Sequence, residues 1–308
     1  MRSSGTRKTT KPSRPDPHRL TLMRVFLWSQ FAIYVKMLYA PISIMGALYD
    51  ISCPAPLSYA GYAWEFLRRN PNYRIAYERS RAAVNTPYKI NSGGSFIRLK
   101  APSKAAAKWG LLSFANPDLA YLEAHVFWTH EVFNQTLSIE FGRERASNLS
   151  EKSIRFSDIS CTRHHLITQD GKRETVLKSP FFWLQLYGQP PSPTKENSRV
   201  TVRIDGRSGM RRRLEVLQFL ADLRDAKPYD CLGQDRPQMF ANLQFYLKIL
   251  DLKPLEMSYK DMSALIIGKD RTQADWDSHG CSLKSKMVRG TTRAVELMQS
   301  GYLDLLAR

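Results

Sequence analysis

The sequence predicts an α+β protein, with a small mixed α/β N-terminal half followed by an all-α domain of the helix-turn-helix type. Three observations support this fold class. Residues 57–81 carry an apolar stripe at helical spacing, residues 164–187 contain short strand-like runs around an Asp-Gly turn, and apolar residues recur every three or four positions from Arg211 onward. At about 150 residues per domain, a chain of 308 residues suggests two domains.

The N-terminal half, residues 45–187, is expected to open with two helices. Tyr62, Phe66 and Leu67 recur at helical spacing and form one apolar face. Asn70-Pro71 ends the first helix, because the residue before a proline avoids the α region. We expect Trp64 and Phe66 to serve the core. The alternative, stacking on the bases of a single-stranded nucleic acid, is less consistent with this spacing.

The middle of the chain is expected to be rich in short strands. Residues 85–105 contain many Asn, Ser, Gly and Pro residues and predict a loop. The clearest signal is a hairpin, in which two strand-like runs flank Asp170-Gly171. The strand candidates are residues 109–139, 164–177, 181–187 and 200–204. Residues 188–199 predict a linker to the helical domain, residues 200–308.

The helical domain is expected to contain about four helices. They cover residues 211–224, 238–250, 259–267 and 282–298. Ser258 predicts the cap of the third helix, with Asp261 three residues later, and Gly268 predicts its end. A further short helix around residues 274–277 would make the domain a tri-helical variant. The inward-facing residues are expected to be Leu214, Leu217, Leu220 and Ala221 in the first helix, Met262, Leu265 and Ile266 in the third, and Leu283, Met287, Thr291, Val295 and Met298 in the fourth.

The last of these helices is the candidate DNA-reading element. Ser282 is expected to cap it, and no acidic residue occurs from His279 to Val295. A short helix, a break and a second helix with a basic outer face are typical of a helix-turn-helix, whose second helix enters the major groove. A solvated face of an ordinary helix bundle is the alternative. The expected base-edge contacts are Ser285, Lys286 and Arg289, and the expected phosphate contacts are Lys260, Arg271, Lys284 and Arg293.

Composition and charge limit the function classes. Hydrophobic residues make up 43% of the chain and aromatic residues 11%, which excludes a disordered chain. The four cysteines are far apart and form no CxxC pair, so a disulfide scaffold and a zinc finger are excluded, and we expect a cytoplasmic location. The net charge of +18 favours an anionic partner, either nucleic acid or a membrane surface. A basic, solvated surface without a partner is the alternative.

The positive charge is concentrated toward the N-terminus. Residues 1–50 carry 8 basic and 2 acidic groups, and residues 51–110 carry 10 and 2. Residues 111–200 are balanced, with 10 of each, and residues 201–308 carry 18 basic and 14 acidic groups. The helical domain therefore holds only a minor part of the excess.

Residues 1–44 combine a basic tail with an apolar extension that is not expected to be part of the fold. Lys36 divides the apolar stretch 25–49 into uncharged runs of 11 and 13 residues, whereas a bilayer span needs about 20. Three interpretations stay open: a membrane anchor, a partner-binding or core helix, and a dispensable extension. The sequence favours the last, which makes a membrane an unfavoured partner.

No motif predicts catalysis. The chain has no Gly-x-Ser-x-Gly, no Walker loop and no dinucleotide fingerprint. His125 and His130 are five residues apart, which suits metal ligands on neither a helix nor a strand, and Cys161 near His164 is too isolated for a catalytic dyad. We therefore expect no enzyme activity, no cofactor and no metal.

Two regions resemble known families. Residues 63–74 (AWEFLRRNPNYR) and Tyr77 resemble the opening motif of a proteobacterial transcriptional-regulator-like domain, and residues 109–111, 116–119 and 124–128 resemble its continuation. Residues 200–308 resemble the DNA-binding domain of the RovC family of type VI secretion transcription factors. The matching stretches are 258–262 (SYKDM), 265–268 (LIIG), Trp276, 282–284 (SLK), Arg289 and 300–306 (SGYLDLL). The chain departs from the family at Ser263, where alanine is more frequent.

The resemblance implies a sequence-specific, DNA-binding transcriptional regulator, often an activator, that self-assembles. Similar proteins control the excision and transfer of integrative mobile genetic elements, and shorter relatives act as antiactivators through protein contacts. The implied partners are double-stranded DNA, further copies of the chain, and RNA polymerase or an antiactivator protein. Two alternatives are kept: a protein-interaction antiactivator that sequesters another regulator, and a membrane-tethered regulator.

Overall fold

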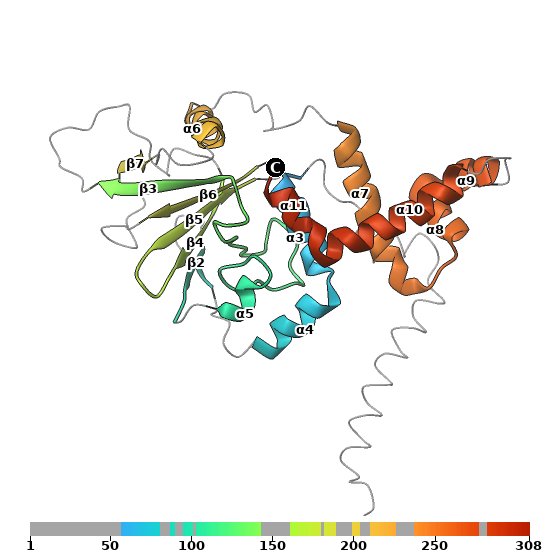
Figure 1. Cartoon of the computed structure of the whole chain (residues 1–308), viewed down its shortest axis with the longest axis horizontal. Coiled ribbons are helices and arrows are strands. Elements are labelled where there is room, and N and C mark those ends of the chain that lie inside the picture. The colour runs from blue at the N-terminus through green and yellow to red at the C-terminus, as the bar shows by residue number, and fades with distance from the viewer. Residues whose placement is uncertain are drawn as a thin grey trace, which may run out of the picture. The chain divides into compact units, whose positions relative to one another are not determined.

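The computed structural model describes ten segments of the chain (Figure 1). They are residues 57–80, 87–89, 95–100, 103–142, 161–179, 182–188, 199–203, 210–225, 237–276 and 282–308. The expectations for residues 1–44, and most of the predicted linker 188–199, lie outside these segments and stay predictions. Among the described helices, none combines the length and the apolar character that a membrane span requires.

Seven strands of the described chain form one mixed sheet, in the order β1-β2-β4-β5-β6-β3-β7. Their bounds are β1 Tyr88–Lys89, β2 Ser95–Arg98, β3 Thr136–Gly142, β4 Thr162–Ile167, β5 Arg173–Lys178, β6 Trp183–Gly188 and β7 Arg199–Arg203. Strand β2 is parallel to β4 and β3 is parallel to β6, while the other neighbouring pairs are antiparallel. The β4–β5 hairpin turns at Asp170-Gly171, where Gly171 has a φ of +81°, so the predicted hairpin is confirmed.

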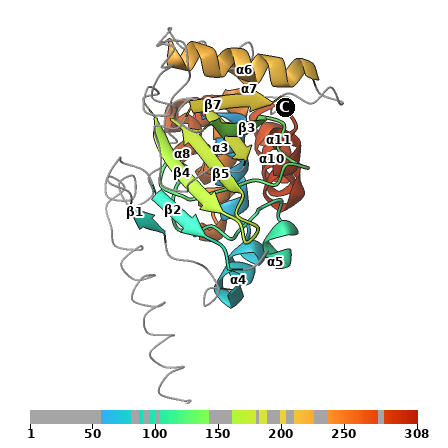
Figure 2. The same ribbon diagram turned by 90° about the vertical axis from the view of Figure 1, so that its left-hand side faces the viewer.

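Both faces of the sheet are covered, and alternate residues of one strand face different cores. Val176 and Trp183 belong to a large cluster that also contains the N-terminal helices. Their neighbours Leu177 and Leu184 belong to a second, smaller cluster. Helix α6 (Met210–Arg224) covers this second face and lies along the sheet (Figures 1 and 2). Because it is buried on both sides, β5 is an uninterrupted run of buried residues.

The predicted helix pair of the N-terminal half is confirmed as α3 (Tyr59–Arg68) and α4 (Pro71–Ser80). The Ser58 side chain caps α3 by accepting a hydrogen bond from the Gly61 amide at 3.2 Å. Nearly all of α3 is buried, and Trp64 and Phe66 are both 0% exposed. The Trp64 indole donates to the Leu119 carbonyl at 3.1 Å. The core role expected for these two aromatic residues is therefore confirmed.

Two expectations for the N-terminal half are wrong. Residues 85–105 were expected as a loop, but they contain β1, β2 and the start of the short helix α5 (Lys104–Ala107). Residues 109–139 were expected as short strands, but they contribute an isolated bridge between Leu111 and Trp128 and, at their end, the start of β3. The apolar side chains of this region are buried, but they project from irregular backbone rather than from a pleated strand. The alternation of apolar runs with turn residues therefore does not indicate strands here.

The C-terminal helices have the expected order. They are α7 (Pro237–Leu252), α8 (Tyr259–Ile267), α9 (Lys269–Trp276), α10 (Ser282–Glu296) and α11 (Tyr302–Leu306), with the short segments η3 (Lys253–Leu255) and η4 (Leu297–Gly301). The extra short helix expected around residues 274–277 is confirmed as α9, which begins earlier, directly after Gly268.

Some expected inward faces are wrong. Leu214 is 51% exposed, because α6 turns Val216, Phe219 and Leu220 toward the sheet. Leu265 is 39% exposed, whereas Met262 of the same helix is buried. On α10 the buried positions are Leu283, Met287, Gly290 and Ala294, so its buried face is rotated from the expected stripe.

The N-terminal and C-terminal elements share one hydrophobic core. Residues Cys53–Arg308 form a single compact unit. The cluster around Tyr62, Trp64 and Phe66 of α3 also contains Tyr302 and Leu305 of α11. Helix α11 packs directly on α3. Helices of the C-terminal region are therefore held by residues more than 200 positions earlier in the chain.

Candidate nucleic-acid interface

Helices α8, α9 and α10 pack on one another, and α8 and α10 also pack on α7. Ser258 caps α8 as predicted, because its Oγ accepts a hydrogen bond from the Asp261 amide at 3.2 Å. Gly268 ends the helix with a φ of +112°, a conformation that favours glycine, and α9 starts at the next residue. Gly268 alone therefore separates α8 from α9, and α10 follows them as the third helix of the group.

A buried hydrogen bond fixes the angle between α8 and α9. Ser263 is 0% exposed, and its hydroxyl lies 3.0 Å from that of Thr272, which is 2% exposed. Each hydroxyl supplies the partner that the other needs inside the core. The departure from the family noted in the sequence therefore gives these two helices a polar link that alanine would lack.

Helix α10 approaches α7 closely at a glycine. A Cβ atom at Gly290 would lie 2.7 Å from the Phe245 ring and 3.0 Å from the Ile249 side chain, both on α7. Met287, one turn earlier, is completely buried. This close contact explains a glycine in the middle of a helix, and it fixes which side of α10 faces solvent.

The predicted contact residues of α10 are all exposed: Lys284, Ser285, Lys286, Arg289 and Arg293. Helical geometry divides them into two flanks. Lys286, Arg289 and Arg293 follow at spacings of three and four and form one basic stripe. Lys284 lies about 160° around the axis from Lys286, because two residues turn a helix by about 200°. Ser285 lies between the two flanks.

The charges of this face are only lightly compensated. Lys286 lies over the Phe245 ring, with its Nζ 5.1 Å from the ring centroid, and Arg289 donates to the Ser285 carbonyl of its own helix at 3.3 Å. Arg293 pairs with Glu296 at 3.0 Å. Elsewhere in the domain, Arg271 lies 3.6 Å from Asp275, and both side chains are largely exposed. Lys260 is exposed on α8 and also interacts with another group of the protein. Exposed ion pairs of this kind contribute little to stability, so their cations are available to a phosphate.

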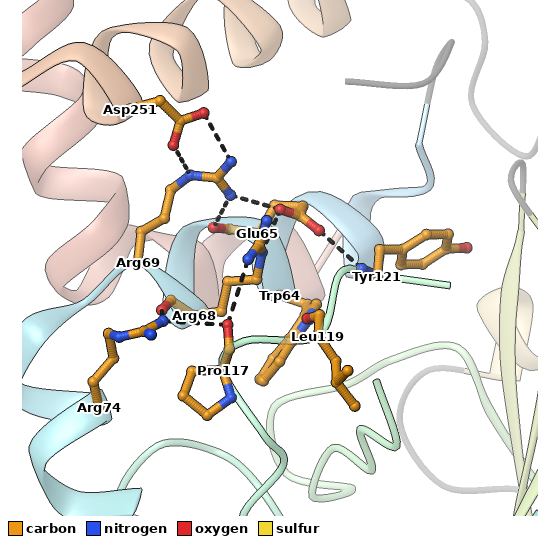
Figure 3. Close-up of polar contacts among 9 residues, drawn as sticks. All are labelled: Trp64, Glu65, Arg68, Arg69, Arg74, Pro117, Leu119, Tyr121 and Asp251. Atoms are coloured by element: carbon orange, nitrogen blue, oxygen red, sulfur yellow. Dashed lines mark hydrogen bonds and ion pairs between the residues drawn. The ribbon is translucent and has the colours of Figure 1, made fainter. Parts of the chain in front are cut away.

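A buried ion network connects α3 to α7 (Figure 3). The Arg69 guanidinium donates to both carboxylate oxygens of Asp251 on α7, at 2.6 and 2.9 Å. It also donates to the Glu65 carboxylate at 2.6 Å, which Arg68 contacts at the same distance. The second oxygen of Glu65 accepts from the Tyr121 amide at 2.9 Å. We call Glu65, Arg68, Arg69 and Asp251 the α3–α7 clamp.

The electrostatics of the clamp reflect these contacts. Burial alone would raise the pKa of the Glu65 carboxyl, but Arg69 and Arg68 lower it below its usual value. Burial would likewise lower the pKa of Arg69, yet its bonds to Asp251 and Glu65 raise it. The Glu65 carboxylate and the Arg69 guanidinium are therefore both charged at neutral pH, and each offsets the cost of burying the other.

Asn70 connects the same helix pair to the far end of α10. Its side-chain nitrogen donates to the Met298 carbonyl at 3.0 Å, and its side-chain oxygen accepts from the amides of Asn72 and Tyr73, which start α4. Met298 lies in η4, a π-helical segment whose widened turns interrupt regular helix bonding. The clamp and Asn70 thus hold α7 and the end of α10 at two separate points.

The histidines noted in the sequence lie away from this interface. His164 and His125 have ring centroids 4.5 Å apart, and the Nδ1 atom of His164 lies 2.5 Å from the Ser95 hydroxyl. Burial, together with the nearby Lys178 ammonium, lowers the pKa of His164 to about 2 and that of His125 to about 4. These imidazoles are neutral groups of the core. In the described segments, no group of three or more His, Cys, Asp or Glu side chains is arranged to hold a metal.

Sequence reasoning missed the clamp. The signal was present, because Glu65 precedes Arg68 and Arg69 by three and four residues, the spacing at which helical side chains meet. The partner Asp251 lies 182 positions after Arg69, and nothing local indicates it.

Comparisons with known proteins agree with this arrangement. Residues 50–114 match the family model of a proteobacterial transcriptional regulator-like domain. Residues 203–307 match the family model described as "T6SS, Transcription factor, DNA binding domain". No curated protein matches the chain. Both resemblances drawn from the sequence are confirmed, and the matches indicate a DNA-binding transcriptional regulator with DNA as its partner.

Proposed function

We propose that this protein is a sequence-specific transcriptional regulator, acting as an activator, that reads the major groove of double-stranded DNA with the helix over residues 282–298. One observation carries the proposal. The outer face of α10 exposes Lys284, Lys286, Arg289 and Arg293, with no acidic residue between Ser282 and Val295. The opposite face is fixed by close packing on α7. A helix that is packed on one side and exposes basic side chains on the other is the element that such recognition requires.

The two flanks of α10 suggest a division of roles. Ser285, Lys286 and Arg289 lie in the first two turns, which enter a groove most deeply, and they are assigned to base edges. Lys284 and Arg293 lie on opposite flanks, so each would face a different phosphate strand bordering the groove. Lys260 and Arg271 would add phosphate contacts from α8 and α9.

The finer features of the proposal rest on the family resemblance. They are activation rather than repression, assembly into homo-oligomers, contact with RNA polymerase or an antiactivator, control of a mobile genetic element, and action in the cytoplasm. We assign no catalytic step, because the interface offers positioned cations and hydroxyls for binding alone.

Genome-wide mapping of the sites that the protein occupies would test the proposal, followed by titration of the purified full chain against an enriched site. We expect discrete sites that share a sequence, with binding that weakens linearly in log affinity as log salt rises. Uniform occupancy, or no measurable binding to enriched duplexes, would contradict it. Capture of another regulator without DNA binding would favour the antiactivator alternative.

A further inference from the structure

The largest excess of positive charge lies outside the matched DNA-binding segment. From Arg79 to Pro117 the chain contains no acidic residue and seven basic ones: Arg79, Arg81, Lys89, Arg98, Lys100, Lys104 and Lys108. Residues 201–308, by contrast, carry 18 basic and 14 acidic groups. A protein whose DNA contacts were confined to α10 would leave this N-terminal excess without a role.

Four of these cations lie at the ends of two elements: Arg98 and Lys100 at and just after the end of β2, and Lys104 and Lys108 at the start and the C-cap of α5. Arg98, Lys100, Lys104 and Lys108 are all exposed, and within the described residues no ion pair neutralises them. We call these four residues the α5 basic surface. Lys104 and Lys108 are one helical turn apart, at a spacing that places them on one side of α5. Like charges at this spacing repel each other, which is tolerable where an anion binds.

The base of this surface is rigid. Ser103 caps α5 by accepting from the Ala106 amide at 3.2 Å, and Ala106 is 0% exposed. Trp109, directly after Lys108, packs edge-on against Tyr73 of α4 at 5.5 Å between ring centroids. The core therefore sets the backbone positions of Lys104 and Lys108.

Helix α11 connects this surface to the DNA-reading helix. The Tyr302 hydroxyl donates to the Trp109 carbonyl at 3.2 Å, and α11 continues α10 through η4. Tyr302 follows Arg293 by nine residues, on the far side of η4. Figures 1 and 2 agree that α5 lies beneath α11. Trp109, the residue after Lys108, is therefore in direct contact with the helix that continues α10.

We propose that the α5 basic surface binds the phosphate backbone of the same duplex, beside the groove that α10 reads. The contact is independent of sequence, because lysine ammonium groups meet phosphate oxygens as point charges. It would give the N-terminal matched region a direct share in DNA binding and would fix the angle of the duplex across α10. This inference rests on the proposed DNA-reading function and adds a second surface to it.

The test is a salt titration of the full chain with Lys104→Gln/Lys108→Gln. The probes are the enriched duplex and a mixed-sequence duplex of the same length, about 30 base pairs or three turns. Loss of two phosphate contacts should lower the salt slope by about 1.8 and weaken binding to both probes by on the order of ten-fold near 0.1 M salt. The ratio of the two affinities should stay unchanged.

Arg203→Gln/Arg211→Gln is the control, because it also removes two exposed positive charges: Arg203, which lies on β7 at the other end of the strand order from β2 and pairs with Glu140, and Arg211 on α6. We expect the control to keep the wild-type slope. An equal fall in both variants would show an effect of net charge alone and overturn the proposal. An unchanged slope in the lysine variant would overturn it too, as would unchanged DNA binding with lost binding to phosphatidylserine vesicles. If the wild-type chain has no specific site, the DNA-reading function itself fails, which is a distinguishable result.

Discussion

Helices α3 and α10 both present arginines, but they use them in opposite ways. On α3, Arg69 is closed between the carboxylates of Glu65 and Asp251, with 18% of its side chain exposed. On α10, Arg289 is exposed and, among the described residues, bonds to a carbonyl of its own helix, while Arg293 is 48% exposed and pairs with Glu296. The first kind of arginine holds elements together, and the second kind is available to a ligand.

Acidic neighbours, rather than the arginines themselves, distinguish the two roles. Glu65 is within one turn of Arg68 and Arg69, whereas no acidic residue occurs from His279 to Val295. A buried cation needs a partner to offset its desolvation, but a DNA-contacting cation gains its partner on binding. Substitutions on α3 should therefore affect stability, and substitutions on α10 should affect DNA binding.

Replacing Trp64 should have the largest effect and should act on the fold. Trp64 is 0% exposed and bonds to the Leu119 carbonyl at 3.1 Å. Trp64→Ala should therefore lower the free energy of unfolding by about 3–5 kcal/mol, the range for large aromatic truncations in cores. Chemical denaturation of the full chain measures this. A fully stable variant with weakened DNA binding would show that the indole contacts nucleic acid instead.

Opening the clamp should come next. Asp251→Ala leaves Arg69 partly buried with one carboxylate fewer, and we expect a loss of about 2–3 kcal/mol in unfolding free energy, less than for a fully buried pair. Glu140→Ala is the matched control, because it breaks an exposed pair with Arg203 and should cost under about 1 kcal/mol. The double variant Arg69→Met/Asp251→Leu should recover most of the loss. Equal costs for the two single variants would refute a special role for the clamp.

The arginines of α10 should leave unfolding unchanged and affect binding. Arg289→Ala should cost about 1–3 kcal/mol at the specific site and relax the sequence preference there. Arg293→Ala should weaken binding to every sequence alike and lower the salt slope by about one unit. Anisotropy titrations at several salt concentrations separate these signatures. Identical behaviour of the two variants would contradict the assigned roles.

The clamp should also make a smaller contribution to the pH dependence of the free energy of unfolding. The pKa of Glu65 is lowered in the folded protein, so its contribution is complete above the unfolded value near 4.5 and is lost as pH falls through the folded value. Each unit of lowering is worth about 1.4 kcal/mol. Glu65→Gln should therefore show a shallower loss of stability below pH 4.5 than the wild-type chain. Parallel curves for the two proteins would contradict this origin.

The sequence predicts local structure well where its signals are local. The α3–α4 break at Asn70-Pro71, the Asp170-Gly171 hairpin and the cap at Ser258 depend on a few adjacent residues, and the structure contains all three. Predictions of which side of a helix is buried fail where the partner is distant in sequence. Leu214 faces outward because α6 packs on the sheet rather than on its neighbouring helices.

At the candidate interface, too, local features follow from the sequence and long-range contacts do not. Exposure of the α10 cations follows from the acid-free, amphipathic pattern of that helix, and the structure confirms it. The division into two flanks follows from the buried positions Met287 and Gly290, which are set by α7. The clamp joins residues 182 positions apart, so only the folded chain reveals it.

Binding of the Lys286→Ala/Arg289→Ala double variant to an enriched duplex is the measurement that bears most directly on α10 as the DNA-reading helix. Both side chains are exposed on one stripe, so unfolding should match the wild-type chain. We expect a loss of specific affinity of at least about 2 kcal/mol and a reduced salt slope, because two base-edge contacts, both positively charged, are removed together. If the folded double variant binds with unchanged affinity and salt dependence, α10 does not read DNA, and the protein-interaction alternative takes its place.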